Sequence, residues 1–171
     1  LPPGVGRAVI SVKLVPDQDR AQAMIQDPAR RIVQMIWITT TPDKVYSSLA
    51  HELTHTVLAT QFAEDFPIWA HEGIASRQDD EGRRGHVQAV VREMASTQNW
   101  PRLESLLTAR AVSHNDSRAY ATSSSLVNFL TDRADNATLL RFAIEGRQSG
   151  WDGALKRHYG INNVGELQIA W

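Results

Sequence analysis

The sequence contains no cysteine among its 171 residues. Disulfide bonds, thiol nucleophiles and thiolate-bound zinc are therefore excluded, and any metal ion must be held by His, Asp or Glu. An excess of one charge is also missing, because 18 basic and 19 acidic residues leave a formal net charge of -1. This balance gives no electrostatic reason to expect nucleic acid or an anionic membrane surface as a partner.

Long apolar runs are absent as well. No stretch approaches the length needed to span a bilayer, and the opening LPPGVGRAVISV lacks the basic start and apolar segment of a signal peptide. Because the chain starts without Met, we expect a mature form or a piece of a larger protein, and we favour export or a cell-envelope location. The composition is that of an ordinary globular protein, and the length suits one domain over residues 1–171. The sequence does not indicate an oligomeric state.

Two segments near the start are rich in Val and Ile and are predicted to be strands, Arg7–Pro16 and Arg30–Thr40. The polar stretch Asp17–Ala29 between them is expected to be a connection that holds a short helix at most. Within the second segment, VQMIWITT is a candidate edge strand that would add an extended peptide to the sheet.

A helix is predicted from Lys44 to about Phe62, because Thr41, Pro42 and Asp43 form a typical helix start. Pro67 opens a second helix, and Asp79–Gly85 is interpreted as a charged, solvated loop. Further helical pieces follow. The predicted fold is α+β, mostly α: strands in residues 1–43, the helices of residues 44–98, and a helical part in residues 99–171.

The motif HELTH within the first helix carries the functional hypothesis. His51 and His55 are four positions apart, so both imidazoles lie on one face of the helix and can bind one ion. Glu52 is offset by about a quarter-turn, which suits a carboxylate that contacts a metal-bound water. The opposite face is expected to be buried through apolar side chains that also step by four: Val45, Leu49, Leu53 and Val57.

A catalytic zinc site with two His ligands needs a third protein ligand and an open position for water. Glu72, in IWAHEGIA, is the favoured third ligand, because the chain has room to turn after His55 and place a second helix beside the first. The small residues Gly73 and Ala75 would allow that helix to pack closely. His71 is the competing ligand, and it points about a quarter-turn away from Glu72.

These motifs resemble those of the gluzincin metallopeptidases, in the group of peptidase-MA-like domains. There H-E-x-x-H is followed, after a short connection, by W-x-x-E-G-x-A. The helices from Tyr120 onward and the closing VGELQIAW are similar to the carboxy-terminal helices of such domains, so the resemblance covers roughly Ile32 to Trp171. It implies a zincin-like fold and hydrolysis of peptide or protein substrates.

The resemblance also implies the roles of individual residues. Zn²⁺ would be held by His51, His55 and Glu72, with Glu52 as the general base. In aminopeptidase-type gluzincins a Tyr before an apolar helix stabilises the oxyanion, and Tyr120 occupies that position. The Gly usual three residues later is replaced by Ser123, and the alternative donor is His114 in the preceding loop. The G-A-M-E-N strand that binds a free amino terminus is absent, which favours an endopeptidase.

Rival functions remain open at this stage. One is a non-catalytic metal-binding module that mediates protein or cell-envelope interactions, although the intact Glu52 argues against it. The other is a metal-free helical interaction domain.

Several other side chains are considered structural. Ser76 is a candidate partner of His51, with a solvated helix surface as the favoured interpretation. His86 and His158 are expected on the surface. Four Trp residues are expected to be core or interface anchors: Trp69, Trp100, Trp151 and Trp171.

Overall fold

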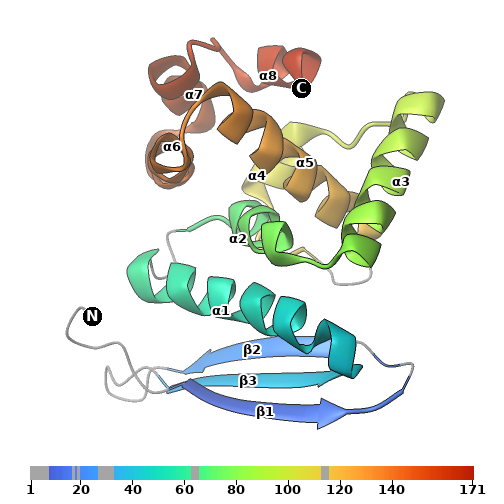
Figure 1. Ribbon diagram of the computed structural model, residues 1–171. Helices are drawn as coiled ribbons and strands as arrows, with labels where there is room; N and C mark the ends of the chain where they lie inside the picture. The colour runs from blue at the N-terminus through green and yellow to red at the C-terminus, as the bar shows by residue number, and fades with distance from the viewer. Residues whose placement is uncertain (1–7, 17, 19, 27–32, 63–65, 113–115) are drawn as a thin grey trace.

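A small sheet forms one end of the molecule, and the helices stack on one of its faces (Figure 1). The computed structural model describes residues 8–16, 18, 20–26, 33–62, 66–112 and 116–171. The sheet contains β1 (Ala8–Leu14), β2 (Arg20–Gln26) and β3 (Val33–Thr40) in the order β1-β3-β2. The expected architecture, an amino-terminal sheet followed mainly by helices, is confirmed.

The sheet topology corrects two predictions. The segment expected to be a connection contains β2, which pairs antiparallel with β3. Pairing with a neighbouring strand supplies hydrogen bonds and packing that outweigh weak strand propensity. β3 lies in the centre of the sheet, with β1 parallel on its other side, so VQMIWITT is not an edge strand. The parts of the predicted segments at Arg7 and residues 27–32 lie outside the described residues.

Helix α1 (Val45–Phe62) covers the sheet and follows the short 3-10 turn η1 (Pro42–Lys44), as predicted to within one residue. It packs against β2 and β3, whose layer beneath it includes the buried Ile36 and Ile38. Its predicted apolar stripe is only partly correct. Leu49 and Leu53 are half-buried, but Val57 is 59% exposed.

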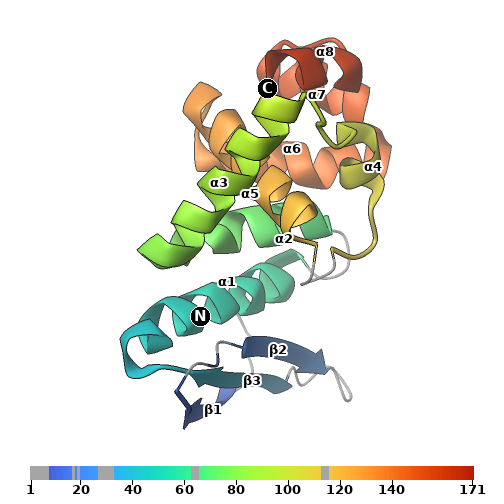
Figure 2. The same cartoon turned by 90° about the vertical axis from the view of Figure 1, so that its right-hand side faces the viewer.

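Beyond α1 lies a stack of helices that Figures 1 and 2 show from two sides. These elements are α2 (Ile68–Ala75), η3 (Ser76–Gln78), α3 (Glu81–Thr97), α4 (Leu103–Thr108), α5 (Ser117–Arg133), α6 (Asn136–Ser149), α7 (Trp151–Tyr159) and α8 (Val164–Ala170). α5 is central in this half, because it contacts α2, α3 and α6. α2 contacts both α1 and α5, so it joins the sheet side of the molecule to the helical side.

The main core lies among these helices and confirms the expected role of the tryptophans. Trp69 is fully buried on α2, with its ring centroid 6.2 Å from Phe142 and 6.0 Å from Trp151. Trp100 and Trp171 form a second aromatic pair with centroids 5.1 Å apart. Glu72 therefore sits on a helix that is anchored in the core three residues earlier.

The region predicted to be a solvated loop, Asp79–Gly85, is mostly helix. Asp80 caps α3 by accepting a hydrogen bond from the backbone N–H of Arg83, which stabilises a helix start despite two glycines in the first turns. Asp79, directly before the cap, is only 2% exposed. The surface prediction holds for His86 but is wrong for His158, whose Nε2 lies 2.9 Å from Glu145 on α6.

Candidate metal centre

Three potential ligands converge between α1 and α2. His51 and His55 present their Nε2 atoms 3.2 Å apart, one turn from each other on α1. Glu72 on α2 places its carboxylate oxygens 3.9 Å from Nε2 of His51 and 3.8 Å from Nε2 of His55. One ligand atom from each residue lies within 4.8 Å of the others, and the three side chains are buried or partly buried. This group could hold a metal ion.

The spacing of the two imidazole nitrogens matches a small divalent ion. Tetrahedral coordination with bonds of about 2.0–2.2 Å gives ligand–ligand edges of roughly 3.4 Å. The His51–His55 edge of 3.2 Å already has this length. Each imidazole has a different Glu72 oxygen near it, Oε2 at 3.9 Å from His51 and Oε1 at 3.8 Å from His55, so the carboxylate must move inward to bind one ion together with both imidazoles.

Close helix packing sets the position of Glu72. The next residue, Gly73, faces α5 so tightly that an added Cβ would lie 2.4 Å from the carbonyl oxygen of Ser123 and 2.4 Å from a methyl group of Val127. A side chain at Gly73 would push α2 away from α5. Gly73 therefore allows α2 to pack closely against α5, as its small size predicts. Glu72, the preceding residue, faces α1.

Sequence reasoning missed Asp79, which holds His51 from behind. The Nδ1–H of His51 donates a hydrogen bond to Oδ1 of Asp79 at 2.9 Å. With the proton on Nδ1, the lone pair of Nε2 faces the other two ligands, as a metal-binding imidazole requires. Burial raises the pKa of Asp79, but hydrogen bonds from His51 and Tyr120 and the charge of Arg83 outweigh it and lower the pKa below its ordinary value.

Tyr120, the predicted oxyanion donor, lies in the first turns of α5. Its hydroxyl donates to Oδ2 of Asp79 at 2.5 Å, and its ring lies 6.3 Å from the His51 ring at an interplanar angle of 29°. Burial, together with the negative charge of Asp79, raises the pKa of Tyr120, so the hydroxyl keeps its proton. The oxyanion role stays a prediction. The alternative donor, His114, lies outside the described residues.

Glu52 follows His51 on α1 and is buried. Its role as general base stays a prediction. The competing ligand His71 is not part of the convergent group identified among the described residues. Its ring lies 5.8 Å from that of His55 and edge-on to Phe66, and burial lowers the pKa of His71 to about 4. His71 is therefore a neutral neighbour of the centre at physiological pH.

Ser76 is not the solvated residue that the sequence favoured. It is buried, and its hydroxyl donates to the carbonyl oxygen of Gly73 at 2.8 Å and lies 2.9 Å from the hydroxyl of Ser124, which can donate to it. The contact with Ser124 ties the end of α2 to α5. The partner of His51 is Asp79, so Ser76 contributes to the centre only through helix packing.

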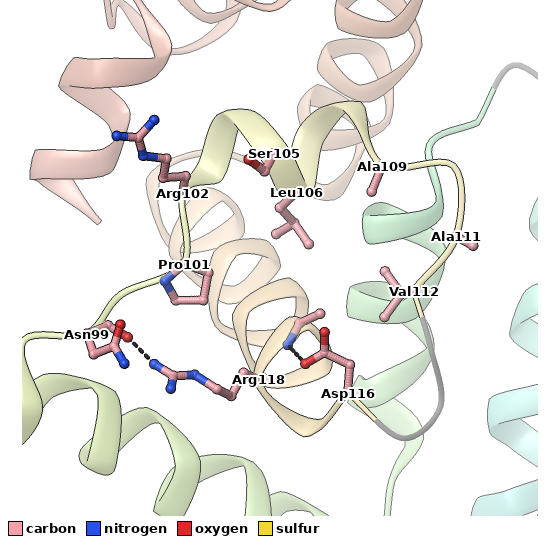
Figure 3. Close-up of a pocket in the computed structure, with 11 residues that line it drawn as sticks. Asn99, Pro101, Arg102, Ser105, Leu106, Ala109, Ala111, Val112, Asp116 and Arg118 are labelled. Carbon is pink, nitrogen blue, oxygen red and sulfur yellow. Dashed lines mark hydrogen bonds between the residues drawn. The ribbon is translucent and has the colours of Figure 1, made fainter.

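A pocket of about 450 Å³ lies between α4 and the start of α5 (Figure 3). Residues from Asn99 to Ala119 line it, later in the chain than the three ligands. Leu106 and Val112 are among its apolar lining residues, and Arg102 and Arg118 bring positive charge to it. Arg118 donates to the backbone carbonyl of Asn99. None of the three candidate ligands lines this pocket.

Comparisons of the chain with protein-family models, with curated proteins and with solved structures gave no match. In the part of the chain that the structure describes, no helix has both the length and the apolar character that a membrane span requires.

Proposed function

We propose that the protein is a zinc-dependent metallopeptidase of the gluzincin type that hydrolyses internal peptide bonds of peptide or protein substrates. The observation that carries the proposal is the convergence of His51, His55 and Glu72 on one point, with Glu52 buried beside the first ligand. Two imidazoles and a carboxylate form the donor set of many catalytic zinc sites, and three protein ligands leave a fourth position for water or substrate.

The proposed chemistry assigns a separate task to each residue. A bound zinc ion supplies a Lewis acid and lowers the pKa of water toward neutrality. Glu52 accepts the proton of the attacking water and delivers it to the leaving amine. Asp79 keeps the proton of His51 on Nδ1, so that Nε2 remains a ligand. A role for Tyr120 at the oxyanion requires its hydroxyl to leave Asp79.

The burial of the site supports this assignment. Glu52 and Glu72 are each 6% exposed, and a buried carboxylate interacts more strongly with a cation than one in water.

The test uses zinc-loaded wild-type protein with metal content measured at one ion per chain. We expect it to cleave an unfolded protein and internally quenched peptides that are blocked at both ends. Glu52→Gln is expected to keep the zinc and to lower kcat by a factor of about 10²–10⁴, the usual contribution of a general base. Glu93→Gln, the same change on the exposed face of α3, is the matched control and should cleave like wild type.

The outcomes separate the rival functions. Zinc-loaded wild type that cleaves none of these substrates would overturn the peptidase proposal and leave a metal-binding module that recruits a protein or envelope component. Wild type that binds no divalent ion would leave a helical interaction domain. Cleavage by Glu52→Gln at the wild-type rate would remove Glu52 from the mechanism.

A further inference from the structure

The carboxylate of Asp79 joins three parts of the molecule. Its Oδ1 atom accepts from His51 on α1, and its Oδ2 atom accepts from Tyr120 on α5, 28 and 41 positions away in the sequence. Asp79 itself precedes α3, and the Arg83 guanidinium on the first turns of that helix lies 3.5 Å from Oδ1. The side chain of Asp79 is almost completely buried at this junction.

We propose that Tyr120 is a positioning residue for the metal centre: its hydroxyl fixes the Asp79 carboxylate, which in turn fixes the His51 imidazole. The inference rests on the proposed metal centre. It assigns Tyr120 a task that needs no substrate, in contrast to the oxyanion role predicted from the sequence.

A single hydrogen bond leaves the Asp79 carboxylate free to rotate. The torsion that rotates an Asp carboxylate has a broad energy minimum, so one hydrogen bond to His51 does not fix its plane. The second bond, from Tyr120 to the other oxygen, defines the plane through both oxygens. Arg83 approaches the same oxygen as His51, at 3.5 Å, and adds positive charge there.

The aromatic ring of Tyr120 adds a second constraint. It lies nearly parallel to the imidazole of His51, at 29°, while the His55 ring meets the same imidazole edge-on at a centroid distance of 4.9 Å. His51 is thus held in its plane by Asp79 and limited in tilt by two neighbouring rings. A ligand held in this way loses less side-chain entropy when an ion binds.

The positioning role and the oxyanion role predict different measurements. Loss of positioning weakens zinc binding in the absence of substrate. Loss of an oxyanion donor lowers kcat and leaves zinc affinity unchanged. Residues that orient a metal ligand typically change metal affinity 10–100-fold when replaced.

The experiment measures zinc dissociation constants by competition with a chromophoric chelator, without substrate. Asp79→Asn is expected to weaken zinc binding by about 10–100-fold, and Tyr120→Phe, one contact further away, by roughly 3–10-fold. The double variant should bind zinc about as tightly as Asp79→Asn alone, because both changes break one chain of contacts. The visible spectrum of the cobalt-substituted protein should change in Tyr120→Phe, since the Asp79 carboxylate, and with it the His51 imidazole, is then free to turn.

Matched controls are available within the chain. Tyr46→Phe removes the hydroxyl of an exposed tyrosine on α1, and Tyr159→Phe removes one whose oxygen is buried without a hydrogen-bond partner in the described structure. Both should bind zinc like wild type. Asp80→Asn makes the same charge change next to Asp79 and keeps a side chain that caps α3.

If Tyr120→Phe does not fold, a labelled tyrosine that keeps the hydroxyl tests the same inference. 3-Fluorotyrosine at position 120 keeps the hydroxyl, and its ¹⁹F resonance should shift when zinc is added, whereas the same label at position 159 should not respond. Wild-type zinc affinity in folded Tyr120→Phe, or an unresponsive label at 120, overturns the inference and leaves the metal centre intact. Failure of wild type to bind zinc would instead remove the metal centre itself.

Discussion

Gly73 on α2 packs directly against the backbone of Ser123 on α5, where a Cβ on the glycine would lie 2.4 Å from the serine carbonyl oxygen. That oxygen belongs to the backbone and cannot rotate away to make room as a side chain could. Because Gly73 adjoins Glu72, the same contact sets the depth at which the third ligand sits.

Gly73→Ala is therefore expected to destabilise the protein by about 1–3 kcal/mol, in the range of overpacked cores, and to weaken metal binding. Urea unfolding of the metal-free protein measures the first effect, and a metal titration measures the second. Gly85→Ala is the control, because an added Cβ there meets no atom within 4 Å. That change in the interior of α3 should stabilise the protein by about 0.5–1 kcal/mol. Equal stability of the two variants would contradict the packing argument.

Metal binding should depend on the three convergent ligands. His55→Ala and Glu72→Gln are each expected to lower zinc affinity by at least about 100-fold, because two protein ligands remain. His86→Ala, on the exposed face of α3, is the control and should bind zinc normally. Isothermal titration of each metal-free variant measures the affinity.

Removal of the ion should also lower the melting temperature. A ligand present at 100 times its dissociation constant adds about 2.7 kcal/mol to the free energy of unfolding, and a chelator removes this contribution. The chelator should leave the melting temperature of Glu72→Gln almost unchanged. An identical response of wild type and this variant would place the ion elsewhere.

Tyr159 should make the protein sensitive to alkali. Burial, reinforced by the negative charge of Asp135, raises the pKa of Tyr159 to about 12. An unfolded Tyr releases its proton near pH 10, so above this value the unfolded chain is favoured as pH rises. The protonated Tyr159 thus contributes on the order of 2 kcal/mol to the free energy of unfolding. This contribution is complete below about pH 10 and is lost as the pH approaches 12.

Tyr159→Phe should therefore lose less stability than wild type between about pH 9 and about pH 11. Urea unfolding at the two pH values measures the difference, and Tyr46→Phe serves as the exposed control. If Tyr159→Phe and wild type lose the same free energy of unfolding over this range, ionisation of Tyr159 is not the cause of the loss.

The candidate ligands could be found from the sequence because their relationship is local. The four-residue spacing of His51 and His55 defines one helix face, and Glu72 falls on the next helix. Asp79 could not be found in this way, because its contacts with His51 and Tyr120 span 28 and 41 positions. Only the packing of α1, α3 and α5 brings these groups together.

The predicted and observed structures differ at two further places, again because of contacts that the local sequence does not reveal. β2 was not predicted because its sequence, RAQAMIQ, has few β-branched residues, and antiparallel pairing with β3 stabilises it as a strand. The start of α3 was read as a loop from its charges and glycines. The cap by Asp80 and the burial of Asp79 favour a helix there instead.

The spacing of the site residues along the chain has a consequence for the entropy cost of folding. His51 and Glu72 are about half as far apart in the sequence as Asp79 and Tyr120, and each doubling of a closed loop costs about 0.6 kcal/mol in chain entropy. The proposed ion would close the shorter loop by cross-linking α1 to α2. The bond between Asp79 and Tyr120 on α5 closes the longer one, so metal loading would lower the chain-entropy cost of only the first of these two closures.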